Sequence, residues 1–140
     1  MSSSDPARPG GHESPAFTLL VVDDHAAIRE LVMMLVGAQY PRCRLLEAES
    51  AEDALVLCSA ERPDLIVLDI TLPGMDGFEA TRRIKELCPQ TLIVMHSSSD
   101  QPVYQAASLA AGASAFVGKG RNSRTLVPVI ASLMPRRASL

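Results

Sequence analysis

The chain has 140 residues, of which 47% are hydrophobic and 21% are charged, and its formal net charge is −3 at pH 7. This size and balance fit one soluble globular domain with a hydrophobic core, and the mild acidity argues against a protein that coats nucleic acid or anionic lipid. The apolar runs are too short to span a membrane, and the first residues lack the apolar core of a secretory signal.

The ends of the chain differ in composition from its middle. Residues 1–16 are rich in Ser, Pro and Gly, so we expect a disordered leader there, one domain over residues 17–134 and a short tail over 135–140. The three cysteines are odd in number and have no CxxC spacing, which favours free thiols over a disulfide or a zinc site. Free thiols are typical of a reducing compartment, so a cytoplasmic location is expected.

Strand and helix patterns alternate from residue 17 onward. In chain order they predict a strand at 17–22, a helix that ends near Gly37, a strand at 43–48, a helix ending near 61, a strand at 64–69, a helix over 77–88, a strand at 91–96, a helix ending at Gly112, a strand at 114–118 and a helix within 123–134. Ser50 is the expected cap of the second helix, and Ser99 or Asp100 that of the fourth. Pro128 predicts a late start or a kink in the last helix.

Five buried strands that alternate with five helices predict an α/β fold. The expected architecture is a doubly wound, five-stranded parallel sheet of the flavodoxin-like (βα)5 type, with helices on both faces. In such folds the functional crevice lies at the carboxyl ends of the strands, where the strand order switches.

Polar residues occur at that same edge of the predicted sheet. Asp23 and Asp24 follow the first strand, Asp69 ends the third, Ser97 follows the fourth and Lys119 follows the fifth. Any one of these acids could simply cap a helix or be solvated. Three carboxylates and one ammonium together indicate a hard divalent cation, and Mg²⁺ fits best because it takes few carboxylates and keeps waters for a phosphoryl substrate. Without metal, mutual repulsion should raise the carboxylate pKa values.

Two motifs extend this pattern, VVDDH at 21–25 and LIVLDITLPGMDG at 65–77, together with Ser97, Phe116 and Lys119. They resemble the receiver domain of two-component response regulators over about residues 17–134. The resemblance implies that Asp69 is the nucleophile that takes a phosphoryl group from a sensor histidine kinase or a histidine phosphotransfer protein.

The same resemblance implies the remaining roles at the site. Mg²⁺ would be held by Asp24 and Asp69 directly, by Asp23 through water and by the backbone carbonyl of Thr71. Lys119 would neutralise charge on the phosphoryl oxygens.

The resemblance also implies a switch that is read by other proteins. Ser97 would bind the attached phosphoryl group, and Phe116 would then rotate inward, which changes the face formed by the fourth helix, fifth strand and fifth helix. The protein would remove its own phosphoryl group slowly and so be a signalling switch, not a conventional enzyme. A homodimer through that face fits the family, and contact with DNA is expected only through an output domain outside this sequence.

Three residues deserve separate interpretation. His25 resembles a feature of the subfamily with helix-turn-helix output domains; it is either a hydrogen-bonding neighbour of the site or a plain first-turn residue. His96 stands where the family usually has an apolar residue, and we expect a core histidine with one satisfied nitrogen. Gly120 follows Lys119 where many receivers have Pro, so the cis Lys-Pro bond of the family is absent.

Three alternative functions compete with this interpretation. A flavin binder would need a donor-rich phosphate loop after the first strand, where this chain has acids. A phosphatase of the haloacid dehalogenase type would need a second Asp two residues after Asp69, where Thr71 stands. A pseudo-receiver that works as a phosphorylation-independent interaction module would keep the fold without the chemistry.

Overall fold

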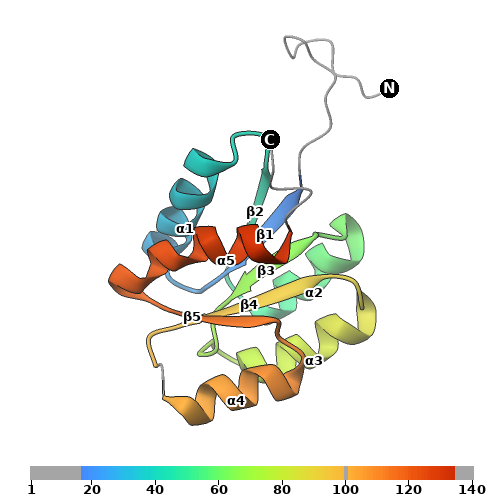
Figure 1. Cartoon of the computed structure of the whole chain (residues 1–140). Helices are drawn as coiled ribbons and strands as arrows, with labels where there is room; N and C mark the ends of the chain where they lie inside the picture. The colour runs from blue at the N-terminus through green and yellow to red at the C-terminus, as the bar shows by residue number, and fades with distance from the viewer. Residues whose placement is uncertain (1–16, 100, 135–140) are drawn as a thin grey trace.

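A computed structural model describes residues 17–99 and 101–134 of the chain, built around a parallel sheet (Figure 1). The predicted leader, the predicted tail and Asp100 lie outside the described residues. The strand order is β2-β1-β3-β4-β5. The strands are β1 (Thr18–Val22), β2 (Arg44–Ala48), β3 (Leu65–Leu68), β4 (Leu92–Ser97) and β5 (Ala115–Gly118).

Helices cover both faces of this sheet, as the alternating pattern predicts. In Figure 1, α1 and α5 lie on one side, and α2, α3 and α4 lie on the other. The helices are α1 (Ala26–Gln39), α2 (Ala51–Glu61), α3 (Gly77–Leu87), α4 (Pro102–Ala111) and α5 (Leu126–Leu133), and a 3₁₀ helix, η1 (Gly120–Thr125), precedes α5. The doubly wound α/β fold is therefore confirmed.

Two apolar clusters hold the helices on the sheet, one on each face. Successive strand residues point to opposite faces, so Leu19 and Leu65 join the cluster under α1 and α5, whereas Leu20 and Ile66 join the one under α2 and α3. This two-sided burial explains why the strand segments are continuous apolar runs. Each such side chain, 0% exposed, stabilises the fold by about 1.5–3 kcal/mol relative to leaving it in water.

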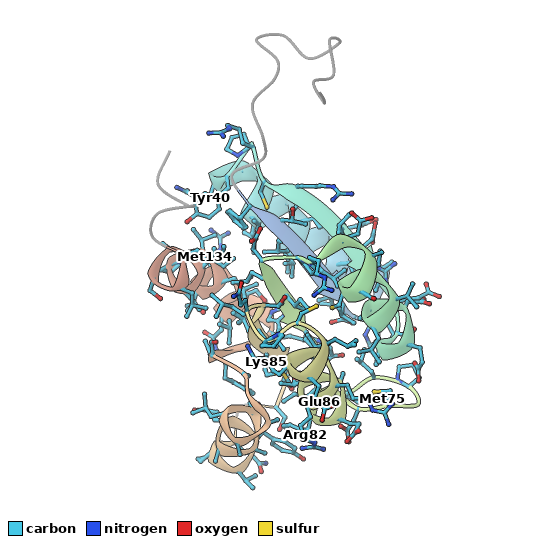
Figure 2. The ribbon with its side chains drawn as sticks, turned by 90° about the vertical axis from the view of Figure 1, so that its right-hand side faces the viewer. Tyr40, Met75, Arg82, Lys85, Glu86 and Met134 are labelled. Carbon is cyan, nitrogen blue, oxygen red and sulfur yellow. The ribbon has the colours of Figure 1, made fainter. Side chains whose placement is uncertain are left out.

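The two ends of the sheet are distinguished by the loops they hold. Figure 2 shows Tyr40, which follows α1, and Met134, which follows α5, away from Met75 at the other end. Met75 lies in the loop between β3 and α3, at the carboxyl ends of the strands. Within the described residues, no helix has the length and apolar character that a bilayer crossing requires.

Two helix boundaries differ from the prediction. Gly37 does not end α1, which continues to Gln39, because glycine inside a helix costs only about 1 kcal/mol and the buried Val32 and Val36 pack the last turns onto the sheet. Ser99 does not cap α4; its N–H donates to Ser97 Oγ, and the cap residue is Gln101, without a side-chain hydrogen bond.

Other local predictions are confirmed. Ser50 caps α2, with its Oγ accepting a hydrogen bond of 3.1 Å from Asp53 N. Helix α5 starts late, at Leu126, so Pro128 falls in its first turn, where the missing N–H costs little. Cys43, Cys58 and Cys88 are free thiols, the last two buried.

Candidate functional site

The strand register brings two of the predicted carboxylates together. Strands β1 and β3 are neighbours in the sheet, and Val22 pairs with Leu68 at their carboxyl ends. The next residue on each strand is an aspartate, and Asp69 N donates to Val22 O at 2.9 Å. Asp23 and Asp69 therefore leave the sheet side by side, although 46 positions separate them in the sequence.

A lysine from the far strand neutralises this pair. Lys119 Nζ lies 2.8 Å from Asp23 Oδ2 and 3.2 Å from Asp69 Oδ2. The two aspartates are only 1% and 3% exposed, so without a counter-charge their desolvation would be costly. Lys119 is itself anchored, because its N–H donates to Ser97 O at 2.8 Å.

Burial and the charge of the ion-pair partner shift the pKa values of Asp69 and Lys119 in opposite directions. Burial raises the pKa of Asp69 above its usual range; Lys119 and the Thr71 N–H oppose that shift, and Asp23 adds to it. The predicted rise is confirmed for Asp69, although desolvation contributes more than repulsion. Burial on its own would lower the pKa of the Lys119 amine, but its contacts with Asp23 and Asp69 outweigh burial and raise it.

His25 is a hydrogen-bonding neighbour of the site, which decides between its two interpretations. Its Nδ1 lies 3.1 Å from Asp23 Oδ1 and 3.3 Å from Asp24 Oδ1, and its backbone N–H donates to Asp23 Oδ1 at 2.9 Å. The ring itself is exposed, as is Asp24 at the mouth of the cluster. His25 thus fixes the orientation of the buried Asp23 carboxylate.

The cluster has the composition of a cation site. Asp23, Asp24, His25 and Asp69 each offer one ligand atom, and these atoms all lie within 4.8 Å of one another. Asp23 Oδ2 is buried and, although paired in charge with Lys119, makes no hydrogen bond of good geometry. A buried carboxylate oxygen with free acceptor capacity among oxygen ligands fits Mg²⁺, a hard cation.

Two of the other predicted residues, Thr71 and Ser97, are hydrogen-bonded to members of this cluster. Thr71 N donates to Asp69 Oδ1 at 3.2 Å, which turns the loop after β3 back over the acid. Ser97 is buried at the end of β4 and accepts from Ser99 N. Phe116 is half-buried on β5 and packs against the apolar cluster under α2 and α3.

Gly77 keeps the start of α3 close to the acceptor loop. A Cβ at this position would lie 2.5 Å from Asp69 O and 2.6 Å from Ile70 Cα, closer than real Cβ contacts allow. Gly77 N also donates to Ile70 O at 2.7 Å. The glycine is therefore required by the close approach of two backbones.

Arg29 is a residue of the site that the sequence interpretation missed. Its Nη1 donates to Asp23 O at 2.8 Å, and its Nε pairs with Glu47 Oε1 at 2.7 Å. Arg29 follows His25 by four residues, so the two lie on the same side of the first helical turn. That spacing was the available signal.

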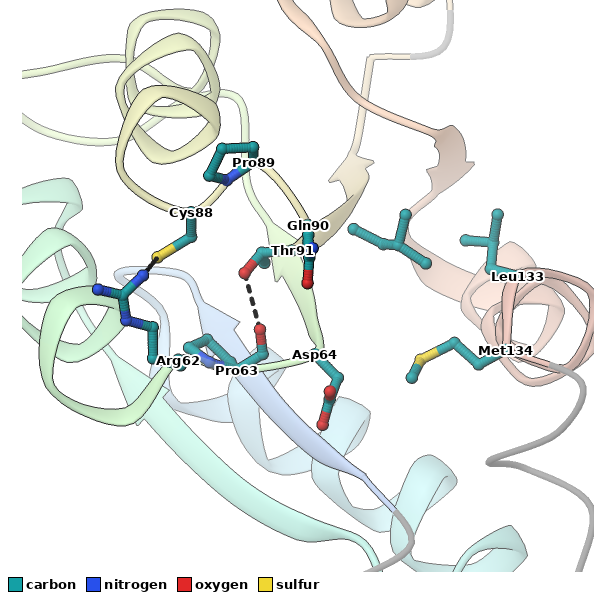
Figure 3. Close-up of a pocket in the computed structure, with 10 residues that line it drawn as sticks. Arg62, Pro63, Asp64, Cys88, Pro89, Gln90, Thr91, Leu133 and Met134 are labelled. Carbon is teal, nitrogen blue, oxygen red and sulfur yellow. Dashed lines mark hydrogen bonds between the residues drawn. The ribbon is translucent and has the colours of Figure 1, made fainter.

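A separate cavity lies at the opposite end of the sheet. It has a volume of about 680 Å³ and opens where Pro63 and Asp64 lead into β3 and Thr91 leads into β4, with Met134 on its far side (Figure 3). Its lining has no group of carboxylates with an ammonium. Within residues 17–99 and 101–134, the carboxylates that group with an ammonium therefore lie at the carboxyl ends of the strands.

Comparisons with known proteins agree with this geometry. The family model of the response regulator receiver domain matches residues 19–131. The transcriptional regulatory protein AfsQ1 of Streptomyces coelicolor is 36% identical over 119 residues, which are 85% of this chain and 52% of AfsQ1, so the chain spans about half the length of this curated relative.

Two solved structures are similar over most of this chain. A two-component response regulator of the LuxR family from Aurantimonas sp. SI85-9A1 has a TM-score of 0.79 and 31% identity, with 85% of each chain covered. The chemotaxis protein CheY4 of Vibrio cholerae has a TM-score of 0.75 and 25% identity, over 83% of this chain and 97% of that one.

Proposed function

Because the chain belongs to the response regulator receiver family, we propose that Asp69 accepts a phosphoryl group in a two-component signalling pathway. The observation that supports this most is the meeting of Asp69, Asp23 and Lys119 at one buried edge. A carboxylate oxygen beside an ammonium can attack phosphorus while the charge that develops on the phosphoryl oxygens is neutralised.

The proposed donor is the phosphohistidine of a sensor histidine kinase or a histidine phosphotransfer protein. An Asp69 oxygen forms the new bond to phosphorus as the phosphorus–nitrogen bond of the donor breaks. The departing imidazole keeps the electron pair of that bond and takes a proton. Lys119, 3.2 Å from Asp69 Oδ2, lies beside the attacking group and neutralises negative charge there.

The acid cluster would hold Mg²⁺ as the cofactor of this step. Its ligands would be Asp24 and Asp69 directly, Asp23 through water and the backbone carbonyl of Thr71. When bound, the ion supplies a positive charge that draws the donor phosphoryl group to the acids and neutralises its oxygens. The His25 N–H would keep the Asp23 carboxylate in place for the ion, and the Arg29 guanidinium holds the backbone carbonyl of Asp23.

A signal would leave the site through Ser97 and Phe116. The Ser97 hydroxyl, buried at the end of β4, would donate to the attached phosphoryl group and pull the following loop toward it. Phe116 would then rotate inward on β5. Helix α4, next to β5, leaves Val103 and Leu109 66% and 57% exposed, which supports the proposal that this face changes partners or forms a homodimer.

The match to AfsQ1 supports a place in gene regulation. AfsQ1 is a transcriptional regulatory protein, and this chain corresponds to about half of its length. We propose a cytoplasmic protein whose effect on DNA, if it has one, passes through a separate output domain.

Labelling with a small phosphodonor tests the function. Acetyl phosphate and Mg²⁺ should add one phosphoryl group, detected by intact-protein mass spectrometry, and Asp69→Asn should abolish it. Asp53→Asn, which changes an exposed carboxylate in the first turn of α2, is the matched control and should label like the wild type. Absence of labelling in the wild type would instead favour the pseudo-receiver, which no observation on the described residues supports.

A further inference from the structure

A buried polar pair lies directly behind the lysine. His96 Nε2 is 2.8 Å from Ser123 Oγ, and each residue is 1% exposed. His96 is two residues after Val94 on β4, so its side chain enters the face covered by α1 and α5. Ser123 belongs to η1, the 3₁₀ helix that follows Lys119. The contact therefore joins the end of β4 to the segment that begins just after the lysine.

The backbone between Lys119 and Ser123 contains one residue with wide conformational freedom. Gly120 immediately follows Lys119 and has φ +87, the left-handed region that favours glycine. A Cβ there would meet nothing within 4 Å, so the space beside this residue is open. On one side of Gly120, Lys119 N is bonded to Ser97 O. On the other side, the His96–Ser123 contact joins η1 to β4, in addition to the packing of η1 on β5 and α5.

We propose that the His96–Ser123 hydrogen bond is a positioning device for Lys119, an inference that rests on the proposed phosphoryl transfer. Ser97 binds the backbone before Gly120, and His96 binds Ser123 after it. Because His96 and Ser97 are consecutive residues of β4, the backbone is fixed to the same strand on both sides of Gly120. Burial, together with a smaller effect of the Lys119 charge that Asp23 opposes, lowers the pKa of His96 to about 4, so the imidazole is neutral at physiological pH. It is therefore a plain hydrogen-bond partner and not a second cation beside Lys119.

Loss of the contact should release η1 and let the lysine backbone move at Gly120. The ammonium would then spend less time at 2.8 Å and 3.2 Å from the two buried carboxylates. A displacement of about 1 Å at a reacting group can slow a reaction by up to a hundredfold. His96 and Ser123 are positioning residues, because neither has a contact with Asp69.

The test compares three variants in the acetyl phosphate assay. Ser123→Ala removes the contact but leaves the His96 nitrogen unpaired. The double variant His96→Leu/Ser123→Ala removes both partners of the hydrogen bond. It therefore lacks the contact without leaving a buried nitrogen unpaired. Thr91→Val is the matched control, because it deletes another buried hydrogen bond, Thr91 Oγ1 to Pro63 O at 2.8 Å, at the far end of β4 (Figure 3).

We expect Ser123→Ala and the double variant to label about tenfold more slowly than the wild type at saturating donor. The half-saturating Mg²⁺ concentration should be unchanged, because neither residue is among the oxygen ligands, and Thr91→Val should label at the wild-type rate. A double variant that labels at the wild-type rate, or a Thr91→Val variant as slow as Ser123→Ala, would overturn the inference.

Hydrogen exchange of the Lys119 amide separates this inference from the proposed function. Ser123→Ala and the double variant should exchange it faster, relative to the amides of β1, than the wild type or Thr91→Val. If the wild type is not labelled at all, the proposed function fails and the exchange rate alone decides on the positioning role. Unchanged exchange in Ser123→Ala would refute it.

Discussion

The buried histidine predicts how the stability of the fold depends on pH. Burial lowers the pKa of His96 from 6.5 to about 4, so the unfolded chain binds a proton in this range that the folded chain does not. The stability contribution of the neutral imidazole is present above pH 6.5 and is lost as the pH falls toward 4. At 1.36 kcal/mol per pKa unit, the difference between these two pKa values corresponds to about 3 kcal/mol.

The variant His96→Leu/Ser123→Ala isolates this effect, because it lacks the titrating group and leaves no unpaired partner. Urea unfolding at several pH values between 7 and 4, followed by far-UV circular dichroism because the chain has no Trp, gives the free energy of unfolding. Between pH 7 and 4 the wild type should lose about 3 kcal/mol more than the variant. Titrating groups outside the cluster around Lys119 are common to both proteins and cancel. Equal losses in the two proteins would refute the assignment of a buried neutral imidazole.

Three further predictions concern the acid cluster and its loop. Gly77→Ala should lower the free energy of unfolding by about 3 kcal/mol, the upper end for overpacking, since the new Cβ would meet Asp69 O at 2.5 Å; unchanged urea stability would contradict this. The pKa of Asp69 is raised in the folded protein, so its charged form is disfavoured there. Asp69→Asn should therefore raise the free energy of unfolding at pH 7, and this gain should vanish below about pH 3.9. A lower free energy of unfolding for Asp69→Asn at pH 7 would contradict the raised pKa. Mg²⁺ at a hundredfold excess over its dissociation constant should raise the free energy of unfolding by about 2.7 kcal/mol, and at the same Mg²⁺ concentration Asp24→Asn should gain less; equal gains would remove Asp24 from the ligand set.

The elements and the position of the site were predictable from the sequence, because they depend on local patterns. Buried parallel strands are short apolar runs, and their carboxyl ends meet at one edge in any doubly wound sheet. Asp23, Asp69 and Lys119 therefore belonged together once the strands were assigned. Boundaries were less predictable: Gly37 stays inside α1 because packing outweighs its low helix propensity.

Only the tertiary structure decided which side chains meet. The Lys119 ion pairs, the Arg29–Glu47 ion pair and the His96–Ser123 contact each join segments whose relative position depends on strand register and helix packing. Hydrophobic periodicity does not predict such contacts. It specifies which face of an element is buried, but not which polar atom of the neighbouring element that face contacts. The sequence determined a sheet with acids at one edge, and the tertiary contacts of Lys119 with Asp23, Asp69 and Ser97 decided how the lysine is held among them.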